Sequence, residues 1–171
     1  MPTFSDAEFE CFVFTFKEGV LSAVAHDLKI RVGRGSITVG EDSVEATFDP
    51  KSLSVICARK DGRDSPGTLS GGDTKKIEGN IGKDVLHTKK HSEIRFASTA
   101  ITRDGDRATI TGDLTLHGKT KSITATATKV GGRWESEVRL HQPDFGIKPY
   151  SAMLGALKVQ PTVTVKLSVP A

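Results

Sequence analysis

Hydrophobic and polar residues alternate with a period of two in many segments of this chain. The pattern is clearest in residues 108–116 and recurs in 44–49, 93–98, 133–140 and 162–169. A period of two is typical of a strand with one buried face and one solvated face. Antiparallel sheets show this pattern, whereas parallel sheets buried on both faces do not. The chain is therefore predicted to be all-β and antiparallel.

Short turn sequences separate the strands between about residues 93 and 142. They are Asp104-Gly105-Asp106, His117-Gly118-Lys119 and Gly131-Gly132. Asp-Gly and related pairs are typical of tight hairpin turns. These residues predict a meander, and the whole chain offers about eight or nine strands. Closing such a sheet into a barrel would remove its exposed edges and leave room for a ligand.

The segment from Phe9 to Lys17 is apolar on both faces. One face carries Phe12, Phe14 and Phe16, and the other carries Phe9, Cys11 and Val13. Such a strand contacts protein or ligand on both sides. The alternation leaves open which face points into the barrel.

Two short helices are expected between the strands. Gly19–Asp27 lacks a strand pattern, and Asp73 can cap a second helix over residues 74–87. An apolar stripe follows the second helix at i, i+4 and i+8, formed by Ile77, Ile81 and Val85. The residues between Cys57 and Asp73 form a polar, glycine-rich loop.

The length and net charge of the chain narrow the classes of function that it can have. The chain has 171 residues and a formal net charge of +3, which fits a single domain over 1–171 and gives no nucleic-acid footprint. Its apolar runs are too short to span a bilayer. The first eight residues carry acids and no basic or long apolar stretch, so we expect a cytoplasmic location. Cys11 and Cys57 are expected to be separate thiols and not metal ligands.

Small side chains occupy the predicted inner faces of two neighbouring strands. Ala108 and Gly112 lie on one, and Ala125 and Ala127 on the next. A solid core usually needs larger residues. Either the barrel encloses an apolar cavity suited to a hydrocarbon chain, or Phe and Trp side chains from other strands fill the space.

Catalytic signatures are weak. The sequence has no G-x-S-x-G, P-loop or H-E-x-x-H motif. His87 and His91 are expected in a solvated loop. His26 and Asp27 are adjacent and would suit acid–base chemistry, but no motif places a nucleophile beside them. We expect no metal site and no catalytic residue.

Four segments, in order, resemble the YceI-like family. They are GVLSAVAHDL at 19–28, GNIGKDVLHT at 79–88 with EIRF at 93–96, ITGDLTLHGKT at 110–120, and PDFGI at 143–147. The third segment is similar to that family's G-x-L-T-L-x-G-x-T hairpin and is the most specific. The resemblance extends over roughly residues 9 to 168.

This resemblance implies a lipocalin-like, extended antiparallel β-barrel of about eight strands with two short helices. It also implies an apolar tunnel for a polyisoprenoid, an isoprenoid quinone, or a fatty acid or amide. Family members are often periplasmic and carry a signal peptide, and they often pair as homodimers. The predicted ligand is therefore a long-chain isoprenoid or acyl lipid, with no other cofactor.

We predict the site residues from the strand pattern. The tunnel wall is expected to include Phe12, Phe14, Ile110, Leu114, Ala125, Trp134 and Val138. Met153, Leu154 and Leu157 are expected to close one mouth, and His26, His117 or Lys119 to meet a polar head group. Two alternatives stay open: a His-based metal-dependent or acid–base enzyme, and a filled-core barrel that serves as a structural or partner-binding protein.

Overall fold

The computed structural model describes residues 1–18, 25–152, 155 and 157–171. Its main sheet has twelve strands in the order β1-β4-β5-β8-β9-β10-β11-β14-β2-β3-β6-β7, and β12 and β13 form a separate ribbon. The elements are β1 (Thr3–Ser5), β2 (Glu10–Thr15), β3 (Asp27–Val32), β4 (Gly35–Val39), β5 (Val44–Phe48), η1 (Pro50–Ser52), β6 (Leu53–Lys60), β7 (Arg63–Ser65), α1 (Gly71–Asn80), η2 (Ile81–Val85), β8 (Ile94–Asp104), β9 (Arg107–Leu116), β10 (Lys119–Val130), β11 (Arg133–His141), η3 (Gln142–Phe145), β12 (Ser151–Ala152), β13 (Leu157–Lys158) and β14 (Thr162–Pro170).

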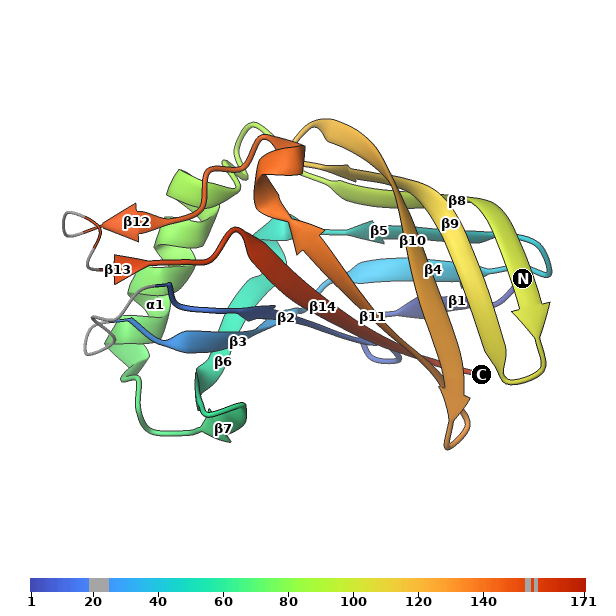
Figure 1. The fold of residues 1–171 in the computed structure, drawn as a ribbon, viewed down its shortest axis with the longest axis horizontal. Helices are drawn as coiled ribbons and strands as arrows, with labels where there is room; N and C mark the ends of the chain where they lie inside the picture. Colours follow the sequence, from blue (N-terminus) through green and yellow to red (C-terminus); the bar gives the residue numbers. More distant parts are fainter. Residues whose placement is uncertain (19–24, 153–154, 156) are drawn as a thin grey trace.

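The main sheet curls into a barrel because two long strands bend in the middle (Figure 1). β3 continues into β4, and β5 continues through η1 into β6. β3 pairs with β6 and β4 with β5, while β2 and β8 lie on their outer sides. If each bent segment counts as one strand and the three-residue edge strands β1 and β7 are set aside, eight antiparallel strands surround the interior. The predicted antiparallel barrel of about eight strands is therefore confirmed.

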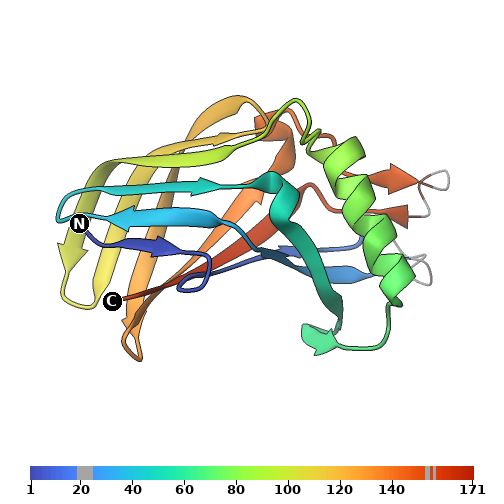
Figure 2. The same ribbon diagram turned by 180° about the vertical axis from the view of Figure 1, so that it is seen from behind.

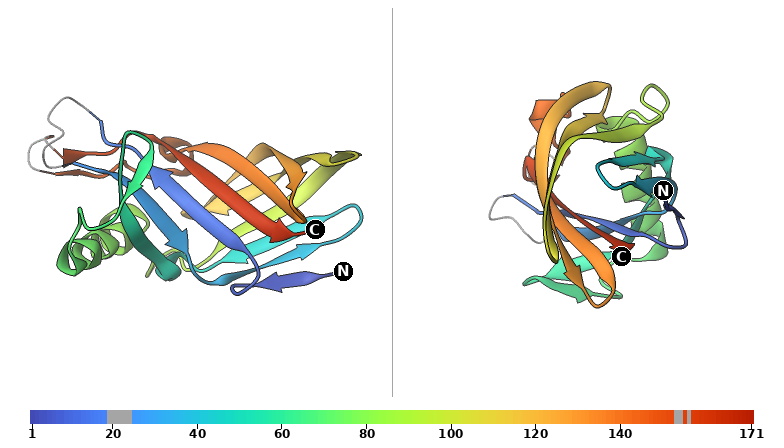
Figure 3. Two further views of the ribbon diagram at one scale, coloured as in Figure 1. Left: turned by 90° about the horizontal axis from the view of Figure 1, so that it is seen from below. Right: turned by 90° about the vertical axis from the view of Figure 1, so that its right-hand side faces the viewer.

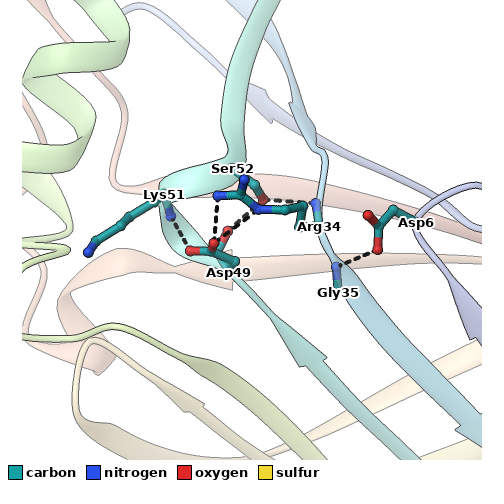
Figure 4. A network of polar contacts seen from close by, with 6 residues as sticks. All are labelled: Asp6, Arg34, Gly35, Asp49, Lys51 and Ser52. Carbon is teal, nitrogen blue, oxygen red and sulfur yellow. Dashed lines mark hydrogen bonds and ion pairs between the residues drawn. The ribbon is translucent and has the colours of Figure 1, made fainter.

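A small polar network holds the bend (Figure 4). Gly33 N–H donates to the Ser52 carbonyl and Asp49 N–H donates to the Arg34 carbonyl. These two bonds connect the β3–β6 ladder with the β4–β5 ladder. The Arg34 guanidinium also lies 2.8 Å from Asp49 Oδ2. The bend is thus fixed by both backbone and side-chain contacts.

Helix α1 packs at one end of the barrel, and both chain termini lie at the other end (Figures 1 and 2). Its N-cap is Ser70, whose Oγ accepts from Asp73 N–H, while Asp73 accepts from Ser70 N–H. Asp73 is therefore the third residue of a capping box and not the N-cap that we predicted. The α-helix ends at Asn80 and continues as the π-helical turn η2. The predicted helix over 74–87 thus begins three residues earlier and changes type after Asn80.

The other predicted helix, Gly19–Asp27, falls mainly on residues 19–24, which lie outside the described residues. Within the described part, Asp27 begins β3. Its Oδ1 accepts from Lys17 N–H at 2.8 Å. Asp27 is therefore a strand residue that fastens the end of β2 to β3.

Two apolar clusters occupy the barrel interior, which Figure 3 shows along the barrel and from its side. The first, near the termini, includes the fully buried Phe9 and Ile37, with Trp134 packed against it. The second, near η2 and η3, contains Leu114, Phe145 and Ile147. We name them the terminal cluster and the η3 cluster.

Candidate functional site

An apolar cavity of about 290 Å³ lies inside the barrel, and residues of both clusters line it. Its wall draws on β2, β3, β4, β5, β6, β8, β9, β10, β11 and β14, together with η2 and η3. Aliphatic and phenylalanine side chains dominate the lining. Among the described residues, none of the lining side chains is charged, and the polar ones are Thr15, Ser136 and Gln142.

Two of the three polar side chains of the wall are engaged with protein partners. Ser136 Oγ donates to the Thr126 carbonyl at 3.0 Å. Gln142 Nε2 donates to the Gln160 carbonyl at 3.1 Å. A cavity of this kind offers burial of apolar surface and few hydrogen bonds, so it suits a hydrocarbon and not a sugar or nucleotide.

Four of the predicted wall residues lie at this cavity: Ile110, Leu114, Ala125 and Val138. They come from three neighbouring strands, β9, β10 and β11. On each of these strands the residues alternate with polar ones, and that alternation is the signal that indicates the inner face. Trp134 shares the inner face of β11 with Val138, but it packs against the terminal cluster instead of the cavity.

Phe12 and Phe14 lie on the outside of the wall, which corrects their expected position. The inner face of β2 is formed by Cys11, Val13 and Thr15. Lys29 Nζ lies 4.6 Å from the centre of the Phe12 ring, and the Arg59 guanidinium lies 4.7 Å from that of Phe14. These cations and their aliphatic stems cover the rings. Because both faces of β2 are apolar, the alternation did not distinguish them.

The end of the cavity near α1 contains residues that we did not predict for the site. Ile81 and Val85 of η2 and the adjacent Leu86 line it. The Ile77-Ile81-Val85 stripe was the available signal, but it indicates any packed helix face equally well. Leu157 lies on β13, outside this lining. The other two predicted mouth residues, Met153 and Leu154, lie outside the described residues.

The predicted head-group residues lie at two different places. His26 lies close enough to Asp73 to affect its pKa, at the start of α1. His117 and Lys119 flank the η3 cluster: His117 Nδ1 is 3.2 Å from the Phe145 carbonyl oxygen, and the Lys119 side chain lies against Gly146. None of the three side chains lines the cavity itself.

His117 also brings together the two histidines expected in a solvated loop. Its ring centre lies 4.4 Å from that of His91 and 5.4 Å from that of His87. Burial lowers the pKa of His117, the hydrogen bond to Phe145 opposes this, and the neighbouring His91, His87 and Lys119 lower it further. Across the described residues, no group of three or more His, Cys, Asp or Glu side chains is arranged to hold a metal ion.

Both cysteines are buried free thiols. Burial raises the pKa of the Cys11 thiol to about 12. Cys11 lines the cavity, yet it is neutral at physiological pH and therefore a poor nucleophile. In addition, the described part of the chain has no helix that is long and apolar enough to cross a membrane.

Part of the sequence, less than half of the chain, matches known proteins. Protein YceI from Escherichia coli O157:H7 is 39% identical over 75 residues, which cover 38% of this chain and 39% of that protein. A UPF0312 protein from Pseudomonas putida W619 is 45% identical over 76 residues, covering 38% of this chain and 40% of that protein. The chain thus spans about two fifths of the length of these curated relatives in the matched region.

Solved structures share the fold. Burkholderia cenocepacia BcnA superposes with a TM-score of 0.68 at 20% identity, covering 97% of this chain and 98% of that one. A polyisoprenoid binding domain from Saccharophagus degradans, implicated in plant cell wall breakdown, gives a TM-score of 0.61 at 11% identity and covers 99% and 97%. At these identities the likeness concerns the fold alone.

A sequence profile of the YceI-like domain matches residues 5–171, almost the entire chain. The barrel topology agrees with this match, as do the ordered motifs that carried the resemblance. The chain belongs to the YceI-like domain family.

Proposed function

We propose that this protein binds a long-chain apolar ligand in the barrel cavity, without catalysis, for storage or transport. Candidate ligands are a polyisoprenoid, an isoprenoid quinone, or a fatty acid or amide. The observation that carries the proposal is the cavity itself, whose described lining contains no charged side chain. The fold shared with a polyisoprenoid binding domain supports it.

Hydrophobic burial supplies the affinity. Each CH₂ group transferred from water contributes roughly 0.8 kcal/mol, so a short run of carbons is enough for tight binding. The volume of about 290 Å³ is close to the lower limit of ~300–1,000 Å³ for small-molecule sites. We therefore expect the cavity to take the end of a chain, with the rest of a longer ligand extending through the η3 end. There, Lys119 and His117 would lie near a polar head group.

The packing of the terminal cluster bears on the alternative that the barrel has a filled core. Phe9 and Trp134 do not line the cavity, and Phe9 packs edge-on against Phe48 with ring centres 5.6 Å apart. Ile37 of the same cluster lines the cavity. The interior thus contains open volume between the two clusters, and we expect a ligand to enter from the η2–η3 side, where Ile81, Val85 and Phe145 line the cavity.

Two measurements test the proposal. Organic extraction of the purified protein followed by mass spectrometry should identify a long-chain lipid that is absent from a control protein purified in parallel. A fluorescent apolar probe, N-phenyl-1-naphthylamine, should bind to protein stripped of lipid. A protein that carries no lipid and binds no probe would overturn the proposal.

A matched pair of variants assigns the binding to the cavity. Ala125→Phe places a ring in the cavity wall, whereas Thr124→Phe places the same ring on the exposed face of the same strand. We expect Ala125→Phe to weaken probe binding at least about tenfold, which corresponds to ~1.4 kcal/mol. Thr124→Phe should bind as the unmodified protein does. Equal affinities for the two variants would place the probe elsewhere.

A further inference from the structure

The wall of the barrel has a seam between β10 and β11. β10 pairs with β9 from Lys119 to Thr128 but with β11 only through Ala127–Val130. The bond from Ser136 Oγ to the Thr126 carbonyl is the next link, and beyond it the two strands diverge (Figure 1). We call the diverging parts, residues 119–125 and 138–141, the β10–β11 seam.

Cavity residues lie on both sides of this seam. Ile123 and Ala125 line the cavity from β10, and Val138 and Leu140 line it from β11. No backbone ladder joins the two strands along the seam in the described register. What separates the cavity from solvent there is therefore side-chain packing and not sheet hydrogen bonding.

The turn η3 covers the seam. It directly follows β11 and contacts β10. Phe145 is 2% exposed and Ile147 is 3% exposed, and both pack with Leu114, Ile123 and Leu140. These two side chains thus fill the space where the strands diverge.

Hydrogen bonds hold η3 unequally on its two sides. Toward β14, Gln142 N–H donates to the Pro161 carbonyl at 2.8 Å and Gln142 Nε2 to the Gln160 carbonyl at 3.1 Å. Toward the β9–β10 hairpin, the described residues supply one hydrogen bond, from His117 Nδ1 to the Phe145 carbonyl oxygen at 3.2 Å. His117 is therefore the polar fastening of η3 across the seam.

This fastening depends on the protonation state of His117. Because a carbonyl oxygen only accepts, Nδ1 must carry the hydrogen, and Nε2 of the neutral ring has a free lone pair. Nε2 is buried and has no hydrogen-bond partner among the described residues. A second proton at Nε2 would find no acceptor there, so a charged ring would have to move toward water.

The charged and titratable neighbours of His117 act in the same direction. His87 and His91 face it from the turn before β8, and Lys119 faces it from the start of β10. From η3, the Phe145 carbonyl is its partner, and Asp144 makes no ion pair with it in the described part of the chain. Protonation would place positive charges next to one another with no carboxylate to offset them.

We propose that His117 is a pH-sensitive latch that holds η3 across the β10–β11 seam, and that its protonation releases η3 and opens a lateral passage into the cavity. This proposal depends on the proposed function in one respect: it assumes that an apolar ligand uses the passage. Acidic pH would then favour loading and release, and neutral pH would favour retention.

The latch itself is tested without a ligand. Hydrogen exchange of the Gly146 and Ile147 amides, normalised to intrinsic rates, is measured at about pH 8 and about pH 5, on either side of the usual His pKa. We expect protection to begin to fall as the pH drops below the ordinary histidine pKa of about 6.5, by up to about tenfold per pH unit, and to level off below the lower pKa of His117 in the closed state. Amides of β4, which lies between β1 and β5 in the sheet and is remote from the seam, should keep their protection.

Two variants identify the titrating group. The Gln side chain of His117→Gln can still donate to the Phe145 carbonyl but cannot titrate, so η3 should stay protected at about pH 5. His141→Gln removes a histidine whose Nδ1 lies 3.4 Å from Thr162 Oγ1, outside the His117 cluster. This control should open with acid as the unmodified protein does. Equal acid opening in His117→Gln and the unmodified protein, or none in either, would overturn the latch.

The release rate of N-phenyl-1-naphthylamine separates the two proposals. We expect faster release at acidic pH in the unmodified protein and in His141→Gln, but not in His117→Gln. If η3 opens with acid while no probe binds at any pH, the proposed function fails and the latch stands. If the probe binds and neither its release nor the η3 amides respond to pH, the latch fails and the proposed function stands.

Discussion

The ring of Phe96 on β8 lies directly over the backbone of Gly112 on β9. A Cβ atom built on Gly112 would fall 2.4 Å from Phe96 Cζ and 2.6 Å from the Ala97 carbonyl oxygen. Phe96 in turn lines the cavity and packs against both apolar clusters. The space that a side chain at position 112 would occupy is thus filled by the Phe96 ring from the neighbouring strand. The ring sets the width of the cavity at this level.

Gly112→Ala should therefore destabilise the protein. The added methyl group has no free space and must displace either the Phe96 ring or the β8 backbone. Such overpacking typically costs about 1–3 kcal/mol in the free energy of unfolding. Urea denaturation of the variant and the unmodified protein measures the difference.

Two controls accompany this measurement. Gly79→Ala in helix α1 adds the same methyl group with no atom within 4 Å and should raise stability by up to ~1 kcal/mol. Combining Gly112→Ala with Phe96→Leu should recover part of the loss, because the two sites are in contact. If Gly112→Ala were as stable as the unmodified protein, Phe96 would not occupy the space described.

The orientation of β2 gives a second prediction, because the sequence did not indicate which face of this strand points inward. Val13 points into the cavity, whereas Phe12 lies outside beneath Lys29. Val13→Trp should fill the cavity and weaken the binding of N-phenyl-1-naphthylamine by about tenfold or more, whereas Phe12→Leu should leave the affinity unchanged. Titration of the two variants with the probe decides between the faces, and the opposite ranking would show that the β2 register is inverted.

The alternation predicts the inner face only for strands with one solvated face. On β9, Thr and Asp alternate with Ile110 and Leu114, so the pattern by itself located two cavity residues. On β2, both faces are apolar, because one meets the interior and the other lies under the cationic groups of Lys29 and Arg59. The alternation carries no information in that case, since long cations cover apolar rings as well as protein does.

The alternation of hydrophobic and polar residues does not predict contacts between segments that are distant in the sequence. The bend that joins β3 to β4 and β5 to β6 depends on Arg34 meeting Asp49, fifteen residues away. Likewise, His87 and His91 lie in a turn as expected, but their rings approach that of His117 at tilted angles, about thirty residues further along the chain. Local periodicity reports which face of a strand is buried, but not which segments meet.

The bend predicts a specific acid sensitivity. Partial burial tends to raise the pKa of Asp49, but hydrogen bonds from Lys51 N–H and Arg34, with the charges of both residues, hold it below its ordinary value of 3.8. The unfolded chain therefore takes up this proton first as the pH falls. The stabilisation from Asp49 is complete well above pH 3.8 and is lost as the pH falls through the lower pKa of the folded state.

Denaturation at a series of pH values tests this effect. Asp49→Asn should be less stable than the unmodified protein near neutral pH, and the difference should shrink in acid below the ordinary carboxyl pKa. Asp42→Asn, at an exposed acid in the β4–β5 loop, should show no such convergence. If the deficit of Asp49→Asn stayed constant down to strongly acidic pH, the Arg34–Asp49 contact would not depend on the charge of the carboxylate.

Cys11 provides the last prediction, because it reports on the interior directly. Its thiol lines the cavity, and burial raises its pKa to about 12, so almost no thiolate is present at about pH 8. Ellman's reagent should therefore leave the native protein unmodified, with Cys57 also buried, and should react with both thiols after denaturation. Cys11→Ser places a hydroxyl group in the apolar wall and should lower the free energy of unfolding by about 1–3 kcal/mol. Rapid labelling of the native protein that mass spectrometry locates at Cys11, or a serine variant of unchanged stability, would mean that Cys11 faces water and that the inner face of β2 is misassigned.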